Sequence, residues 1–63
     1  MFDEYEVIRA RRQLSEKVPL GAQGTVLFVH KYPHPGYLVE FTDGDAEHLD
    51  VLAVVDNDIA KDS

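Results

Sequence analysis

The sequence predicts an all-β fold, a small and strongly bent antiparallel barrel of about five strands. Apolar runs rich in Val, Ile, Phe and Tyr are short, as strands are. Turn signals made of Gly, Pro and Asp separate these runs every eight to twelve residues. A chain of 63 residues makes a single domain, residues 1–63, with a small core. Closing the sheet on itself would remove the exposed edges that a flat sheet leaves.

The strongest strand signal is the run TVLFVHK at residues 25–31. It follows Gly21 and Gly24, which permit the backbone conformations of a turn. Strict alternation places Val26, Phe28 and His30 on one face and Leu27 and Val29 on the other. Both faces are then apolar where the run begins. This favours either a central strand of a curled sheet or a bulge near the glycines.

A second strand is predicted at residues 37–42, after a corner at residues 33–36. The corner sequence Pro-His-Pro-Gly cannot lie inside a strand. Alternation in the second strand gives it a core face of Tyr37, Val39 and Phe41. The Asp-Gly pair that follows predicts a tight turn at residues 43–45.

Before this hairpin, residues 4–10 predict a strand with Tyr5, Val7 and Ile8 as its apolar residues. A short helix is the alternative, because Tyr5 and Ile8 are also three apart. Residues 11–22 predict a loop. Within it, Leu14 and Leu20 are expected to be apolar anchors, and Ser15 with Glu16 to start one helical turn.

After the hairpin, residues 46–55 predict one or two further strands. Asp56-Asn57-Asp58 is typical of a turn or of a helix start, and Ile59 would be a last apolar side chain in the core. Residues 61–63 are expected to be frayed. The ordered part would then run from about residue 4 to residue 60.

Charge and composition narrow the classes of partner. The net charge is −6, and residues 32–63 contain eight acidic side chains against one Lys. This balance opposes binding to nucleic acid and favours a basic protein partner, although acidic side chains also simply keep a small domain soluble. The longest apolar run has five residues, and the N-terminus is acidic where a signal peptide is positive. With no Cys, the chain is expected to be cytoplasmic and outside the membrane.

No cofactor, metal or catalytic group is predicted. His30 and His34 are four apart, but the prolines at 33 and 35 exclude a helix that would bring them to one face. Asp43, Asp45 and Glu47 lack the twelve-residue frame of a calcium loop and suit a charged hairpin turn. The sequence has no nucleophile elbow and no phosphate loop, so we expect a protein that is not an enzyme.

Taken together, these residues resemble the DUF4926 family, small bacterial proteins of uncharacterised function. The resemblance covers about residues 4–60. It begins with Val7-Ile8 and continues with the frame G-x-x-G-T-V-x-x-V from Gly21 to Val29 and with Y-x-V-E-F from Tyr37 to Phe41. The Asp-Gly turn and the sequence D-x-D-I at residues 56–59 complete it. The frame is similar more distantly to SH3-like barrels, including KOW domains and PsaE. The resemblance implies an SH3-like barrel with a long first loop at residues 11–22 and a short helical turn near residues 56–59. It implies no catalytic residue. Phe28 stands where the family pattern usually has a polar residue.

The sequence therefore predicts a non-catalytic module that binds a protein partner or a second copy of itself. An antitoxin or immunity role is one concrete form. The alternative is an accessory subunit of a redox or metalloenzyme complex, and a third is nucleic-acid binding of the KOW type through Arg9, Arg11 and Arg12. Aromatic residues beside the Pro-His-Pro corner would either form a contact surface or cap an open end of the barrel. The candidate contact residues are Phe28, Tyr32, His34, Asp43 and Asp45.

Overall fold

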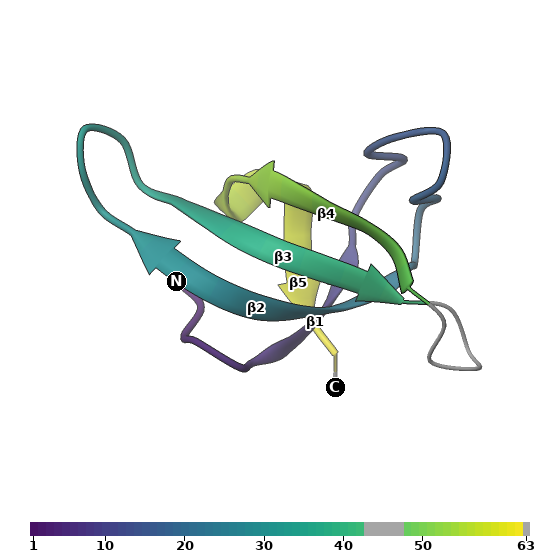
Figure 1. Ribbon diagram of the computed structural model, residues 1–63, viewed down its shortest axis with the longest axis horizontal. Coiled ribbons are helices and arrows are strands. Elements are labelled where there is room, and N and C mark those ends of the chain that lie inside the picture. Colours follow the sequence, from purple (N-terminus) through teal and green to yellow (C-terminus); the bar gives the residue numbers. More distant parts are fainter. Residues whose placement is uncertain (43–47, 63) are drawn as a thin grey trace.

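The computed structural model describes residues 1–42 and 48–62 and confirms an all-β fold. One antiparallel sheet contains five strands in the order β4-β3-β2-β1-β5 (Figure 1). The strands are β1 (Val7–Ala10), β2 (Gln23–His30), β3 (Gly36–Thr42), β4 (His48–Val54) and β5 (Ile59–Lys61). A single 3₁₀ turn, η1 (Asp56–Asp58), joins β4 to β5, close to the predicted helical turn.

The sheet is strongly curved, in agreement with an SH3-like barrel, but it is not closed. β1 and β5 lie behind β2, β3 and β4 in Figure 1, and the concave side between them holds the core. β5 has three residues, and its pairing is with β1. No pairing joins β4 to β5 among the described residues, so β4 keeps a free edge. The predicted closure is therefore corrected to an open, curled sheet.

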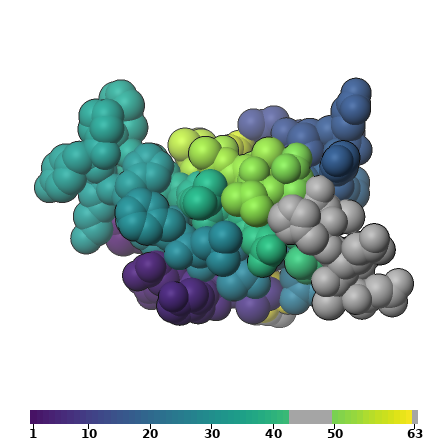
Figure 2. All heavy atoms as spheres, viewed as in Figure 1, coloured from purple at the N-terminus to yellow at the C-terminus, as the bar shows by residue number. Residues whose placement is uncertain are grey.

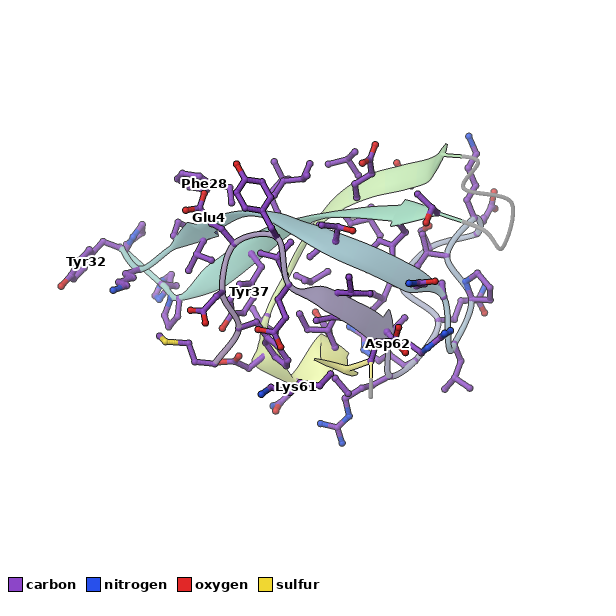
Figure 3. All side chains as sticks on the ribbon, turned by 90° about the horizontal axis from the view of Figure 1, so that it is seen from below. Glu4, Phe28, Tyr32, Tyr37, Lys61 and Asp62 are labelled. Atoms are coloured by element: carbon purple, nitrogen blue, oxygen red, sulfur yellow. The ribbon has the colours of Figure 1, made fainter. Side chains whose placement is uncertain are left out.

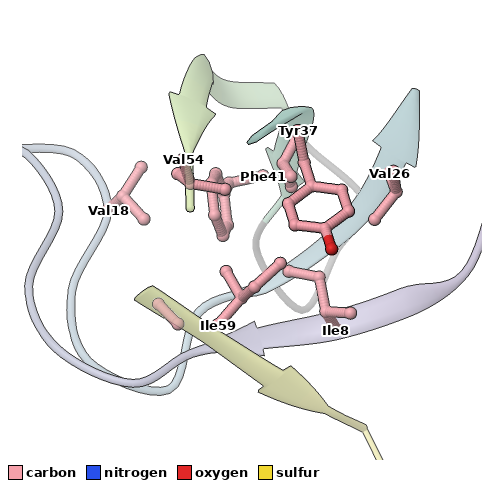
Figure 4. Close-up of a cluster of buried hydrophobic side chains, with 9 residues drawn as sticks. Ile8, Val18, Val26, Tyr37, Phe41, Val54 and Ile59 are labelled. Atoms are coloured by element: carbon pink, nitrogen blue, oxygen red, sulfur yellow. The ribbon is translucent and has the colours of Figure 1, made fainter. Parts of the chain in front are cut away.

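The core consists of side chains from every strand and from the first loop (Figure 4). The predicted core face of β3 is confirmed, because Tyr37, Val39 and Phe41 are all almost fully buried. Buried partners come from the other elements, namely Ile8, Ala10, Val18, Val26, Val54 and Ile59. Such burial is the main favourable term in the folding of a small domain.

The first loop contributes Val18, a residue the sequence pattern did not single out. A tight turn closes on itself here, because the Leu14 N–H donates to the Val18 carbonyl over 2.9 Å and the Val18 N–H donates to the Ser15 carbonyl. The predicted helical turn at Ser15 is thus a bridged turn instead. The turn directs Val18 into the core and leaves Leu20 69% exposed, so Leu20 is not the predicted anchor. Leu14 does pack against the core, as predicted.

Both ends of the chain differ from the prediction. The first strand begins at Val7 and not near residue 4, because a turn at residues 3–6 leaves Tyr5 exposed. At the other end, residues 59–61 form β5 and are not frayed up to Lys61. Asp62 is also held, since its carboxylate accepts a hydrogen bond of 2.7 Å from Arg9 Nε. Pairing with β1 gives this short end an ordered backbone.

Tyr37 connects the core to two other parts of the chain. Its hydroxyl donates to Asp56 Oδ1 over 2.7 Å and accepts from the Phe2 N–H over 3.1 Å. The Phe2 and Tyr37 rings meet edge to face, with centroids 5.6 Å apart. Burial raises the pKa of the Tyr37 phenol above its ordinary value, and the hydrogen bond to the Asp56 carboxylate raises it further.

The raised pKa of Tyr37 predicts a loss of stability in alkali. The folded chain binds the phenol proton more tightly than the unfolded chain, so this contribution is complete below about pH 10 and is lost as the pH rises through the folded-state pKa. Urea unfolding as a function of pH should show the free energy of unfolding falling above about pH 10. Tyr37→Phe should reduce the fall, while Tyr32→Phe, which alters an exposed ring, should leave it unchanged. Equal alkaline profiles for wild type and Tyr37→Phe would contradict this reading.

Gly24 marks a close approach between β2 and β3, and we predict that Gly24→Ala destabilises the fold. A Cβ at this position would lie 2.8 Å from Val39 Cγ1 and 3.0 Å from the Glu40 carbonyl oxygen. Such overpacking costs about 1–3 kcal/mol, measurable by urea unfolding. The control is Gly21→Asn, because a Cβ added at Gly21 would meet nothing within 4 Å and Asn tolerates the φ of 87°. A loss for Gly21→Asn as large as that for Gly24→Ala would refute the packing explanation.

Candidate functional site: an outer apolar face on β2, β3 and β4

A β-bulge in β2 determines which side chains reach the outside of the sheet. Val26 pairs with Val39 and Phe28 pairs with Leu38, so Leu27 is the extra residue between them. Val26 is fully buried, whereas Phe28 is 53% exposed. The strict alternation that put Val26 and Phe28 on one face is therefore wrong beyond Leu27. The bulge, one of the two alternatives that the sequence left open, is the reason.

Phe28 belongs to a row of apolar side chains that crosses three strands. Phe28 on β2 pairs with Leu38 on β3, and Leu38 pairs with Ala53 on β4. Leu38 is 38% exposed, and Ala53 is exposed as well. Residues paired in this way carry their side chains on the same face of the sheet. All three therefore point away from the core.

A second row runs parallel to the first on the same side of the sheet. Val7 pairs with Thr25, Thr25 with Glu40, and Glu40 with Val51. Val7 and Val51 are 39% and 37% exposed. Together the two rows form what we call the outer apolar face, defined as Val7, Phe28, Leu38, Val51 and Ala53. Figure 2 shows the molecule from the side of β2, β3 and β4.

Four members of the outer apolar face, Phe28, Leu38, Ala53 and Val51, are neighbours in the sheet, whereas Thr25 and Glu40 lie between Val7 and Val51. Single exposed apolar side chains are common on folded proteins and have no functional meaning. A contiguous apolar patch on a monomer often marks a binding surface. The chemistry this face offers is burial of apolar area against another surface.

The five predicted contact residues do not lie in one place. Phe28 points outward from β2, whereas Tyr32, 87% exposed, lies at the far end of the β2–β3 hairpin (Figure 3). His34 is exposed in the same hairpin loop. Asp43 and Asp45 lie outside the described residues. Sequence reasoning missed Leu38, Val51 and Ala53, because their grouping with Phe28 depends on strand register.

Two of the three arginines considered for nucleic-acid binding are paired with acidic side chains. Arg9 Nε donates to Asp62 Oδ1 over 2.7 Å, and its Nη1 donates to the Gly21 carbonyl. Arg12 Nη2 donates to Asp58 Oδ1 over 2.8 Å. These pairs join the start of the chain to its end. In each pair a carboxylate neutralises the positive charge of the arginine, which is the charge that would attract the phosphate backbone of a nucleic acid.

Other chemistry-bearing groups form no second site in the part of the chain that is described. His30 lies against Gly36, where an added Cβ would be 2.7 Å from His30 Nε2. No cluster of three His, Asp or Glu side chains with metal-ligand geometry occurs among the side chains that the structure describes, those of residues 1–42 and 50–62. A shallow depression open to solvent is lined by Ser15, Glu16, Lys17 and Asp50. In the same residues, no helix is long and apolar enough to cross a bilayer.

Comparison with family models, with curated proteins and with solved structures finds no match to this chain. The resemblance to DUF4926 therefore stays a prediction. The properties of the molecular surface are therefore the basis for inferring the function of the chain.

If Phe28 belongs to the surface and not to the core, its removal should cost little stability. Phe28→Ala is expected to lower the free energy of unfolding by about 1 kcal/mol or less, as surface substitutions do. The matched change Phe41→Ala, on a fully buried ring, should cost about 3–5 kcal/mol. Urea unfolding of the two variants measures the difference. Similar losses for both would show that Phe28 is part of the core.

Proposed function

We propose that this protein is a non-catalytic interaction module that binds a basic protein partner through the outer apolar face. The observation that carries the proposal is the outward orientation of Phe28, Leu38 and Ala53 in one cross-strand row. Aromatic and aliphatic side chains of this kind form the centres of protein interfaces. An antitoxin or immunity protein for a basic toxin would be one concrete form of such a module.

The charge of the chain supports a basic partner. The net charge is −6, and the pairing of Arg9 and Arg12 with Asp62 and Asp58 leaves still fewer cations available. A chain with this negative net charge would attract a positively charged partner at long range and would repel a negatively charged one. The same charge balance weighs against nucleic-acid binding of the KOW type.

The state of the β4 edge favours docking on the face over addition of a strand. The Val51 N–H donates to Asp50 Oδ1 over 2.9 Å, and the Val55 N–H donates to Asp58 Oδ2 over 3.1 Å. A partner strand pairing along β4 would need the Val51 N–H, and one that extended past Val54 would need the Val55 N–H as well. Carboxylates already occupy these two donors, which favours contact through the side chains of the outer face.

Photo-crosslinking in the cells that make this protein tests the proposal. A benzoylphenylalanine replaces either Leu38 on the outer apolar face or Leu20 on the first loop, which is exposed to a greater extent. We expect a discrete adduct with one basic protein from position 38, absent from position 20 and lost in a Phe28→Ser background. The same adducts from both positions, or none from position 38, would overturn the proposal.

A further inference from the structure

The turn at residues 3–6 holds a tyrosine in a conformation that suits glycine. The Glu6 N–H donates to the Asp3 carbonyl over 3.1 Å, and Tyr5, third in this turn, has a φ of 67°. An L-residue with a side chain adopts such a φ at a cost in free energy that glycine does not have. The ring of Tyr5 gains little from burial in return, because the residue is 74% exposed. Strained residues of this kind cluster at functional sites.

The strained turn lies beside the bulge that turns Phe28 outward. The Tyr5 N–H donates to the Val26 carbonyl over 2.6 Å, and the Val26 N–H donates to the Glu6 carbonyl over 3.0 Å. Val26 is two residues before Phe28, so the turn flanks one end of the outer apolar face. Glu4, which precedes Tyr5, is exposed and lies on the same side of the sheet as Phe28 (Figure 3).

We propose that Tyr5, Phe28 and Glu4 form a subsite that receives an arginine side chain of the partner; this inference rests on the proposed function. Aromatic rings attract a cation placed over their faces, and a neighbouring carboxylate adds a charged hydrogen-bond acceptor. Arginine fits this set better than lysine, because its planar guanidinium stacks on a ring while its N–H groups reach a carboxylate.

A second copy of the chain fits this subsite less well than a basic partner. A second copy would bring the same net charge of −6 to the contact. Two of its three arginines, Arg9 and Arg12, are already held by Asp62 and Asp58, which leaves Arg11. An arginine from a basic protein meets neither obstacle.

Amide chemical shifts from NMR test the subsite with three synthetic peptides. The probe is acetyl-Leu-Arg-Leu-Arg-Leu-amide, with one control in which lysine replaces arginine and one in which neutral citrulline replaces it. We expect the arginine peptide to shift the amides of Glu4, Tyr5 and Phe28, the lysine peptide to bind more weakly, and the citrulline peptide to give no saturable shift.

Two variants of the protein complete the test. Tyr5→Gly suits the φ of the turn, so it should be at least as stable as wild type yet bind the arginine peptide about fivefold more weakly. Glu4→Gln should weaken arginine binding and leave the stability unchanged. Arginine-peptide binding that is unaltered by both variants, or shifts confined to residues 56–58 around Asp56 and Asp58, would overturn the subsite.

Failure of the subsite can be told apart from failure of the proposed function. Tyr5→Gly should diminish the adduct that forms from position 38 in cells. If the wild-type adduct forms and Tyr5→Gly leaves its yield unchanged, the subsite is wrong while the interaction module stands. If no adduct forms in the wild type, the proposed function itself fails.

Discussion

The bulge at Leu27 is the constraint on which the arrangement of this small sheet depends. Because side chains alternate along a strand, one extra residue moves all later side chains of β2 to the opposite face. Without it, Phe28 would point to the core side of the sheet beside Val26, where an additional large ring would have to be packed. The bulge thus places Val26 and Val29 on the core side of β2 and Phe28 on the outer side. It also increases the local twist that lets a single sheet curl around its own interior.

Much of the fold could be predicted from the sequence, because its strongest signals are local. The alternation of Tyr37, Val39 and Phe41 identified a core face directly, and the prolines at 33 and 35 separated two strands, although Gly36, predicted to be in the corner, is the first residue of β3. Elements whose structure depends on pairing with a distant segment of the chain could not be predicted from local sequence patterns. The strand at residues 59–61 is too short to recognise by pattern and is ordered by pairing with β1. Val18 is buried because of a turn whose closure its own residue type does not reveal.

The candidate site was predictable only in part, for the same reason. Phe28 could be singled out as an apolar residue without a clear structural role. Its neighbours in space, Leu38 and Ala53, come from other strands, and only the register places them beside it. The β-branched neighbours Val7 and Ile8 favour a strand that includes Tyr5, whereas the turn that contains Tyr5 is recognisable only from the backbone. The grouping of residues into a surface is therefore a property of pairing, which a single sequence does not display.

The carboxylates at the free edge of β4 have a consequence for the behaviour of the protein in concentrated solution. An open sheet with an unprotected edge can grow by adding strands from other molecules, which is how ordered fibrils extend. Asp50 and Asp58 accept the N–H group of Val51, within β4, and that of Val55, just beyond it, and so leave fewer donors for an added strand. Residues that look like ordinary surface charge in the sequence thereby protect part of one edge of an open sheet, whose other edge strand is β5.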